Sequence, residues 1–299
     1  MATRRAYRVA YDGRPFFGFQ RQPDVPTAED ALLDALAALD VVDRDAGGGG
    51  RDTPPGYAAA GRTDRGVSAV RQTVAFDAPD WLTPRAFSSE LPAGVRVWAS
   101  ADVHPEFHAT HDAARRTYRY HLHAPEADRD RARDAAAALS GEHDVHNLTS
   151  DPRGPNTRRD LSVSVASDDA AAGDRVGDRV EGDADDRAGD EFLTLTVAAG
   201  GFPRECVRRI ATVVRGVAVG DADLDRIAEV LGDEPVSGPR GVAAAAPDPL
   251  VLADVSYPGV AFEPDPVAVA TLREVFSERR VDALARVRVF DDVLAAASE

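Results

Sequence analysis

The feature that most constrains the fold of this chain is an order of predicted elements that occurs twice. Alternating apolar and polar residues predict a strand over residues 6–12, and helical apolar spacing predicts a helix over residues 31–39. The second half begins in the same way, with a strand over residues 117–123 and a helix over residues 128–139. Because each half then supplies strands and a covering helix, we expect an α+β fold of two similar halves.

Further strands are predicted after the helix of each half. In the first half they lie around residues 57–61, 71–77 and 95–102. In the second half the predicted elements are strands at 160–166, 192–198 and 250–256, with helices at 203–217 and 221–231. Residue-by-residue similarity between the halves is weak, so the repeat is one of element order.

These elements divide the chain into three expected parts. They are an N-terminal α+β domain (1–105), a C-terminal α+β domain (106–262) and a helical tail (263–299). Two segments are predicted to lie outside regular structure. Residues 43–55 contain four consecutive glycines, and residues 168–191 carry about ten acidic residues with almost no bulky apolar side chains, which is typical of a solvated insertion.

The charge composition is unusual. The net charge is −16, all 35 basic residues are arginine, and only two residues are isoleucine. This pattern resembles proteins of extremely halophilic archaea, which work in concentrated salt. At about 1 M salt the Debye length is roughly 3 Å, so a negative total does not exclude a polyanionic partner. RNA binding would, however, require local clusters of arginine.

Several classes of protein are disfavoured by what the sequence lacks. Cys206 is the single cysteine, which excludes an intramolecular disulfide and a cysteine-based zinc cluster. The first residues lack the apolar core of a signal peptide, and no run of about 18 apolar residues occurs. We therefore expect a cytoplasmic protein without a membrane segment.

A candidate nucleophile lies in the run Gly61–Ala69, where Asp64 stands between Arg62 and Arg65. Glycines at 61 and 66 allow a sharp turn between two predicted strands, so the turn would present Asp64 at the end of a sheet. Taken alone, Thr-Asp-Arg-Gly is more typical of an ordinary turn than of an active site.

Several segments in order resemble one family, the tRNA pseudouridine synthases of the A type, over most of residues 6–260. The matching segments are residues 11–21 (YDGRPFFGFQR), 61–69 (GRTDRGVSA), 91–92 (LP), 107–109 (FHA), 116–120 (RTYRY), 139–144 (LSGEHD), 201–210 (GFPRECVRRI) and 239–255, which begins PRGVA. This resemblance implies an isomerase that converts uridine to pseudouridine in the anticodon stem-loop, at positions 38 to 40.

The resemblance also implies the roles of four residues. Asp64 matches the catalytic aspartate, which forms a covalent intermediate with the target nucleoside, and Arg208 matches the arginine that pairs with it. Tyr118 matches the tyrosine that stacks on the target base, and Arg62 matches the arginine that holds the uridine out of its stack. Candidate contacts to the RNA backbone are Gln20, Arg21, Arg71, Arg115, Arg119, Arg204 and Arg209.

The same resemblance implies the architecture and the partners. The expected fold is two ferredoxin-like-derived halves that form an extended, mostly antiparallel sheet with a central RNA-binding cleft. The expected partners are tRNA and a second copy of the chain, since the family acts as a homodimer. The isomerisation neither oxidises nor adds anything, so no metal or organic cofactor is expected.

This chain departs from bacterial members of the family at several positions. Arg65 and Ser68 stand where alanine and histidine are usual, and Val145 replaces a usual aromatic residue. Asparagines usually precede the Leu-Pro pair, where this chain has Ser88, Ser89 and Glu90. These departures leave the reaction unchanged and the choice of uridine open.

Two other functions remain possible on the sequence. His104, His108 and His111 have a spacing that could place metal ligands on one helix face, as in a metal-dependent hydrolase, although Pro105 disfavours a helical conformation at His104. The other alternative is an RNA-binding module that has lost the chemistry. The joint presence of Asp64, Tyr118 and Arg208 argues against that module, because binding alone needs no carboxylate facing a polyanion.

Overall fold

The computed structural model describes residues 2–42, 53–167 and 191–297. Its strands are β1 (Ala2–Tyr11), β2 (Ala58–Ala59), β3 (Ser68–Pro79), β4 (Val95–Asp102), β5 (Arg115–His123), β6 (Gly141–Asp144), β7 (Arg158–Ser167), β8 (Phe192–Ala199), β9 (Leu250–Ser256) and β10 (Glu263–Pro264). Most of the predicted loop 43–55 and nearly all of the predicted insertion 168–191 lie outside the described residues.

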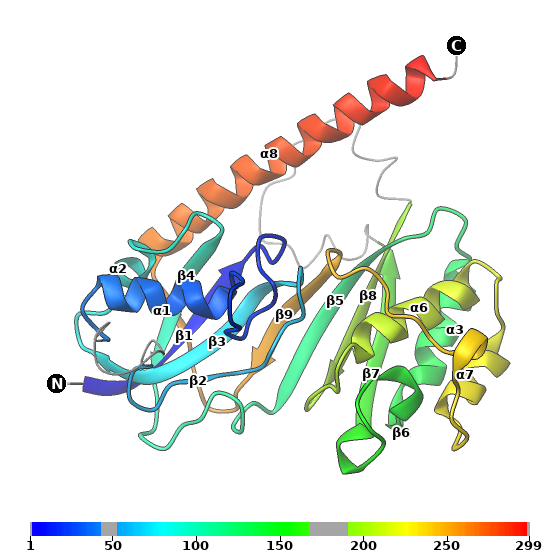
Figure 1. The fold of residues 1–299 in the computed structure, drawn as a ribbon, viewed down its shortest axis with the longest axis horizontal. Helices are drawn as coiled ribbons and strands as arrows, with labels where there is room; N and C mark the ends of the chain where they lie inside the picture. The colour runs from blue at the N-terminus through cyan, green and yellow to red at the C-terminus, as the bar shows by residue number, and fades with distance from the viewer. Residues whose placement is uncertain (1, 43–52, 168–190, 298–299) are drawn as a thin grey trace.

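Within the described residues the ten strands form one sheet, in the order β10-β4-β1-β3-β9-β5-β8-β7-β6, with β2 paired to β3. The printed strand pairs in these residues are antiparallel except β3 with β9, which is parallel. The expectation of a mixed fold with a large, mostly antiparallel sheet is therefore confirmed. Figure 1 shows the sheet running across the whole molecule.

Strand β9 joins the two halves of the sheet although it comes late in the chain. It pairs with β3 through Ser68 to Val251 and Ala69 to Leu252, and on its other edge with β5 through Tyr118 to Leu252. A strand that the sequence predicts as the last of the second half thus lies in the middle of the sheet (Figure 1).

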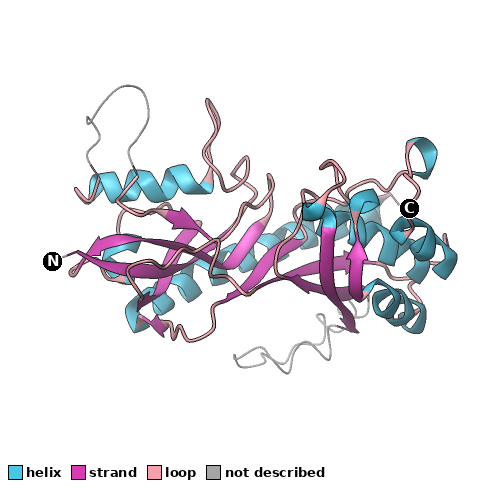
Figure 2. Ribbon diagram, turned by 90° about the horizontal axis from the view of Figure 1, so that it is seen from below, coloured by secondary structure: helices cyan, strands magenta, loops and turns pink. Residues whose placement is uncertain are grey.

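Helices cover both halves of the sheet (Figures 1 and 2). The first half carries α1 (Ala28–Ala38) and α2 (Pro84–Ser88), and the second half carries α3 (Arg129–Leu139), α6 (Cys206–Ala218) and α7 (Leu224–Leu231). Helix α1 begins at Ala28, before the predicted range 31–39, because the hydroxyl of Thr27 caps it by accepting a hydrogen bond from the amide of Asp30 at 3.1 Å. Its Leu32 and Leu36 are fully buried in the core.

The predicted tail is a single long helix, α8 (Pro266–Ala296). The carboxylate of Asp265 caps it by accepting from the amides of Val267 and Ala268. Its first part packs against β4 and α2, and beyond residue 280 every side chain of the described helix is exposed. Figure 1 shows this part running free of the sheet.

Some predicted bounds differ from the structure. The strand predicted over residues 57–61 is only Ala58–Ala59, because β2 pairs with β3 at those two residues alone. The helix predicted from residue 203 begins at Cys206, because Glu205 has a φ of +61°, which a right-handed helix does not contain. No helix among the described residues is both long and apolar enough to span a membrane.

The position of β9 generates a stability prediction. Leu252 in β9 is 2% exposed and Leu224 at the start of α7 is 45% exposed. We expect Leu252→Ala to lower the free energy of unfolding by about 2–5 kcal/mol, because the truncation leaves a cavity in the central strand. Leu224→Ala should change it by less than about 0.5 kcal/mol. Urea unfolding at constant salt measures both, and equal effects would contradict the central, buried position of β9.

Candidate active site

Asp64 lies in the turn that connects β2 to β3. The backbone carbonyl of Asp64 accepts a hydrogen bond from the amide of Val67 at 3.1 Å, which closes the turn. Gly66 has a φ of +81°, a conformation that favours glycine. The side chain of Asp64 is 37% exposed, so its carboxylate is accessible from solvent.

The loop 13–26 packs closely against this turn. The amide of Phe19 donates to the carbonyl of Thr63 at 3.0 Å, and the amide of Gly66 donates to the carbonyl of Phe16 at 3.2 Å. A Cβ atom at Gly13 would lie 2.2 Å from the carbonyl oxygen of Val67, so only glycine fits there. These contacts hold the backbone around Asp64 in one position.

Arg65, in this turn, and Ser68, at the start of β3, contact the same loop. The hydroxyl of Ser68 accepts a hydrogen bond from the amide of Gly13 at 3.0 Å. The guanidinium of Arg65 lies over the ring of Phe17, 4.1 Å from its centroid, where a cation–π interaction is favourable. Both side chains therefore help to fix the loop against the turn.

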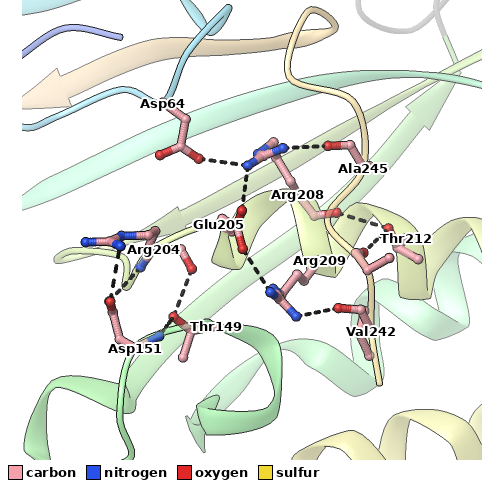
Figure 3. Close-up of polar contacts among 11 residues, drawn as sticks. Asp64, Thr149, Asp151, Arg204, Glu205, Arg208, Arg209, Thr212, Val242 and Ala245 are labelled. Carbon is pink, nitrogen blue, oxygen red and sulfur yellow. Dashed lines mark hydrogen bonds and ion pairs between the residues drawn. The ribbon is translucent and has the colours of Figure 1, made fainter. Parts of the chain in front are cut away.

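Arg208, in the first turn of α6, pairs with Asp64. Its Nη2 lies 3.2 Å from Oδ2 of Asp64 and 3.1 Å from Oε1 of Glu205, and its Nη1 donates to the carbonyl of Ala245 at 2.9 Å. The side chain of Arg208 is 13% exposed. Figure 3 shows Arg208 between the two carboxylates, with Arg209 on the far side of Glu205. Asp64 and Arg208, 144 residues apart in the chain, thus meet across the junction of the two halves.

Tyr118 in β5 presents its ring to the same junction. It is 9% exposed, and the ring of Phe202 meets it edge to face with the centroids 5.4 Å apart. Burial raises the pKa of Tyr118 to about 12; the positive charge of Arg116 opposes this shift and the negative charge of Asp64 adds to it. The hydroxyl is therefore protonated at neutral pH.

A cavity of about 700 Å³ contains these residues. Its walls come from the turn 60–67, from β5, and from the segment 201–208 that leads into α6. Arg62 also lines this cavity and is exposed, with no hydrogen bond or ion pair among the described residues. A larger cavity of about 1130 Å³, between the start of β3 and α8, contains none of Asp64, Tyr118, Arg208 and Arg62.

Arg116 is a site residue to which the sequence analysis assigned no role. Its guanidinium donates to the carbonyl of Ala60 at 2.6 and 3.1 Å, to that of Thr110 at 2.8 Å, and to that of Gly200. It therefore ties together three loops around the cavity. Its position two residues before Tyr118 in an alternating strand places it on the same face, which is the signal that could have identified it.

The candidate RNA contacts are scattered. Arg204 lines the cavity, is 69% exposed, and lies 3.9 Å from Asp151. Arg119 follows Tyr118 in β5 and so points to the opposite face of the sheet, and Arg71 pairs with Asp254 at 3.3 Å. The remaining candidates are Arg209, paired with Glu205; Arg21, paired with Asp30; and Gln20 and Arg115, which are exposed.

The three histidines of the metal hypothesis do not form a ligand set. The rings of His108 and His111 lie 4.2 Å apart, but Nδ1 of His104 and Nδ1 of His108 each accept a backbone hydrogen bond two residues ahead. In the part of the chain that the structure describes, no group of three His, Cys, Asp or Glu residues is placed to hold a metal ion.

Comparisons with known proteins point to one family. Residues 135–258 match the family model described as tRNA pseudouridine synthase. The chain is 49% identical to tRNA pseudouridine synthase A of Haloarcula marismortui, covering 97% of this chain and 98% of the relative. It is 52% identical to the same-named protein of Natronomonas pharaonis, covering 95% and 97%.

Among solved structures, a chain from an archaeal box H/ACA sRNP Nop10–Cbf5 complex covers 71% of this chain and 44% of its own length. Its sequence identity is 13% and its TM-score is 0.31, too low for this likeness to support a conclusion.

The burial of Tyr118 predicts how its hydroxyl titrates. At pH 11 a phenol with a pKa of about 12 is roughly one-tenth ionised, and an unshifted phenol with a pKa of 10 is roughly nine-tenths ionised. We expect the unaltered protein and Tyr118→Phe to differ little in tyrosinate absorbance at pH 11. The difference should be about one-tenth of the absorbance of one fully ionised tyrosine. Far-UV circular dichroism establishes that both proteins remain folded. A difference near one full residue would place Tyr118 in solvent.

Proposed function

This chain belongs to the tRNA pseudouridine synthases, which are isomerases, and on that premise we propose that it isomerises uridines of the anticodon stem-loop through a covalent bond to Asp64. The observation that carries the proposal is the accessible carboxylate of Asp64 in a cavity that also holds Tyr118. The substrate region, positions 38 to 40, follows from the resemblance of the sequence motifs. A tRNA substrate is consistent with a cytoplasmic location.

The proposed reaction exchanges one glycosidic bond for another. A lone pair of an Asp64 oxygen forms a bond to ribose C1′, and the electron pair of the C1′–N1 bond leaves with the uracil. The uracil turns until C5 faces C1′, and C5 bonds to C1′ while Asp64 leaves as a carboxylate. C5 then loses its proton to a base and N1 takes up a proton, so the product is an isomer. A carboxylate suits both steps, because it is a nucleophile and a competent leaving group.

The other cavity residues have roles in binding. Arg208 orients the carboxylate of Asp64 by its hydrogen bond of 3.2 Å. The ring of Tyr118 offers a stacking surface for an extruded base, and its protonated hydroxyl can donate a hydrogen bond. Arg62, exposed beside Asp64, fills the space that the extruded uridine leaves, which offsets part of the cost of a few kcal/mol for extrusion.

Arginines around the cavity contact the RNA backbone. Arg62 and Arg204 lie at the cavity and reach the nucleotides beside the target uridine. Arg71 and Arg119 lie on the opposite face of the sheet, so they are accessible only to a different part of the tRNA. Since no step of the isomerisation transfers electrons to or from the substrate or adds a group to it, it requires no metal or organic cofactor.

The chain arrangement that supports this site is two α+β domains, 1–105 and 106–262, followed by the tail 263–299. Asp64 comes from the first domain, and Tyr118 and Arg208 come from the second. The parallel pairing of β9 with β3 supports this proposal, because it joins the sheets of the two domains beside the cavity. A ferredoxin-like origin of each domain is what the resemblance to the family implies.

The role of Asp64 as nucleophile leads to a sharp prediction. We expect Asp64→Asn to lower the rate of tritium release from C5-labelled uridine in tRNA by at least about a thousandfold, because the variant lacks the anionic oxygen. Asp77→Asn is a matched control, since Asp77 is 43% exposed, pairs with an arginine at 3.5 Å, and lies outside the cavity. It should stay within about twofold of the unaltered protein.

The assay also tests the non-catalytic alternative. Both variants are compared at the same high salt concentration, and tRNA binding is measured in parallel. If Asp64→Asn retains activity within about tenfold, Asp64 is not the nucleophile. If the unaltered protein binds tRNA without releasing tritium, the chain is an RNA-binding module. Mapping of the modified positions in the product tRNA tests the anticodon stem-loop assignment.

We further propose that two copies of the chain associate through α8. Ala283, Val287, Phe290 and Leu294 recur at spacings of four, three and four residues, the pattern of a two-helix seam. Val287 is 52% exposed and Phe290 is 61% exposed, so these apolar side chains of the seam face solvent in the described chain. A second copy would cover the seam.

The charges of α8 favour an antiparallel pair. In the exposed part beyond residue 280, Arg286 and Arg288 precede Asp291 and Asp292, which lie near its end. In an antiparallel arrangement the acidic end of one helix faces the basic part of the other. A two-fold axis gives that arrangement, since it places the same surface of both copies in contact.

The seam predicts different effects at adjacent positions. Phe290→Ser, in the seam, should convert a dimer into a monomer in light scattering after size exclusion. Val289→Ser replaces a residue that is 58% exposed but points away from the seam, and should leave the dimer intact. A dimer that survives Phe290→Ser would show that the copies associate elsewhere, and a monomeric unaltered protein would overturn the proposal.

A further inference from the structure

Glu205, the residue immediately before α6, is bound by two arginines at once. Its Oε1 accepts a hydrogen bond from Nη2 of Arg208 at 3.1 Å, and its Oε2 accepts one from Nη2 of Arg209 at 2.8 Å. Arg209 is itself held by a hydrogen bond from Nη1 to the carbonyl of Val242. Figure 3 shows the resulting chain from Asp64 through Arg208 and Glu205 to Arg209.

The backbone of Glu205 is in an uncommon conformation. Its φ of +61° and ψ of +1° lie in the left-handed region, which is strained for a residue with a side chain. The side chain makes no capping hydrogen bond to α6, although it occupies the capping position. A glycine would fit this backbone with less strain, so the presence of glutamate here points to a role for its carboxylate.

One nitrogen of Arg208, Nη2, contacts two carboxylates at once. Nη2 lies 3.2 Å from Asp64 and 3.1 Å from Glu205, so the two carboxylates share the single positive charge of the guanidinium. The side chain is only 13% exposed, and an arginine charge at that burial is costly when it loses its partner. The hydrogen bond from Arg209 holds the pKa of Glu205 below its ordinary value, so Glu205 is ionised at neutral pH.

The charge of Asp64 changes during the proposed reaction. When an oxygen lone pair of Asp64 forms the bond to C1′, the carboxylate becomes a neutral ester, and the negative charge leaves on the uracil. Arg208 then loses one of its two anionic partners. When C5 bonds to C1′, the electron pair of the ester C–O bond returns to Asp64 and restores the anion.

We propose that Glu205 is a positioning residue that remains the counter-ion of Arg208 while Asp64 is esterified, with Arg209 fixing its other oxygen. This inference rests on the proposed covalent role of Asp64. Because Arg208 stays paired and in place, it can receive the carboxylate again when the ester bond breaks. Glu205 touches no substrate atom and acts through Arg208.

The first test separates chemistry from binding. We expect Glu205→Gln to lower kcat for tritium release by about ten- to a hundredfold while KM for tRNA stays within about threefold. Glu229→Gln is the matched control, because Glu229 also pairs with two arginines, Arg226 at 2.7 Å and Arg240, and lies outside the cavity. Its side chain is 26% exposed, close to the 27% of Glu205. It should leave kcat unchanged. An equal effect of both variants, or a change in KM alone, would overturn the proposal.

A second test does not use activity. If Glu205 and Asp64 both balance Arg208, each compensates for loss of the other, so their effects on thermal stability are not additive. We expect Asp64→Asn to lower the melting temperature more in the Glu205→Gln background than in the unaltered protein. Additive shifts, within about 1 °C, would show that Glu205 does not share Arg208 with Asp64.

The two tests also distinguish this inference from the proposal it rests on. If Asp64→Asn keeps its activity, the covalent proposal fails whatever the melting temperatures are. If Asp64→Asn is inactive and the shifts in melting temperature of the two single variants add up in the double variant, only the role of Glu205 fails. Arg209→Met provides a second variant that leaves both carboxylates in place. It should lower kcat in the same direction as Glu205→Gln, by a smaller factor, since Glu205 loses only its outer partner.

Discussion

The pairing of β9 with two strands is the interaction on which the geometry of the cavity depends. On one edge β9 meets β3, whose first residues complete the turn that holds Asp64, and on the other it meets β5, which carries Tyr118. The backbone groups of a buried strand need partners on both edges, so this register is strongly determined. The distance between a carboxylate and an aromatic ring 54 residues apart in the chain is therefore set by main-chain hydrogen bonds.

Close-range contacts explain how a strongly acidic chain can hold a site for a polyanion. The chain carries a net charge of −16, but Asp64, Glu205, Arg208 and Arg209 form a cluster with two charges of each sign. Hydrogen-bonded pairs at about 3 Å lie within even the short screening length of concentrated salt. The organisation of the site is thus insensitive to the medium, whereas long-range attraction of tRNA is not.

Local sequence patterns predicted much of the secondary structure, but they could not predict contacts between residues far apart in the chain. The strands Val95–Asp102 and Leu250–Ser256 have the predicted bounds, because alternation and turn residues mark both ends. The position of β9 between the two halves could not be predicted in this way, because the alternation of residues within a strand does not say which strands it pairs with. The same holds for Arg116, whose carbonyl partners Ala60, Thr110 and Gly200 lie in three separate loops.

The parallel contact between β3 and β9 is only two residue pairs long. A contact this short places few main-chain hydrogen bonds between the two halves, so side-chain contacts across the junction carry a larger share of their connection. The hydrogen bonds from Arg208 to Asp64 and from Arg116 to the carbonyl of Ala60 are such contacts. The same arginine that orients the carboxylate therefore also fastens the two halves together.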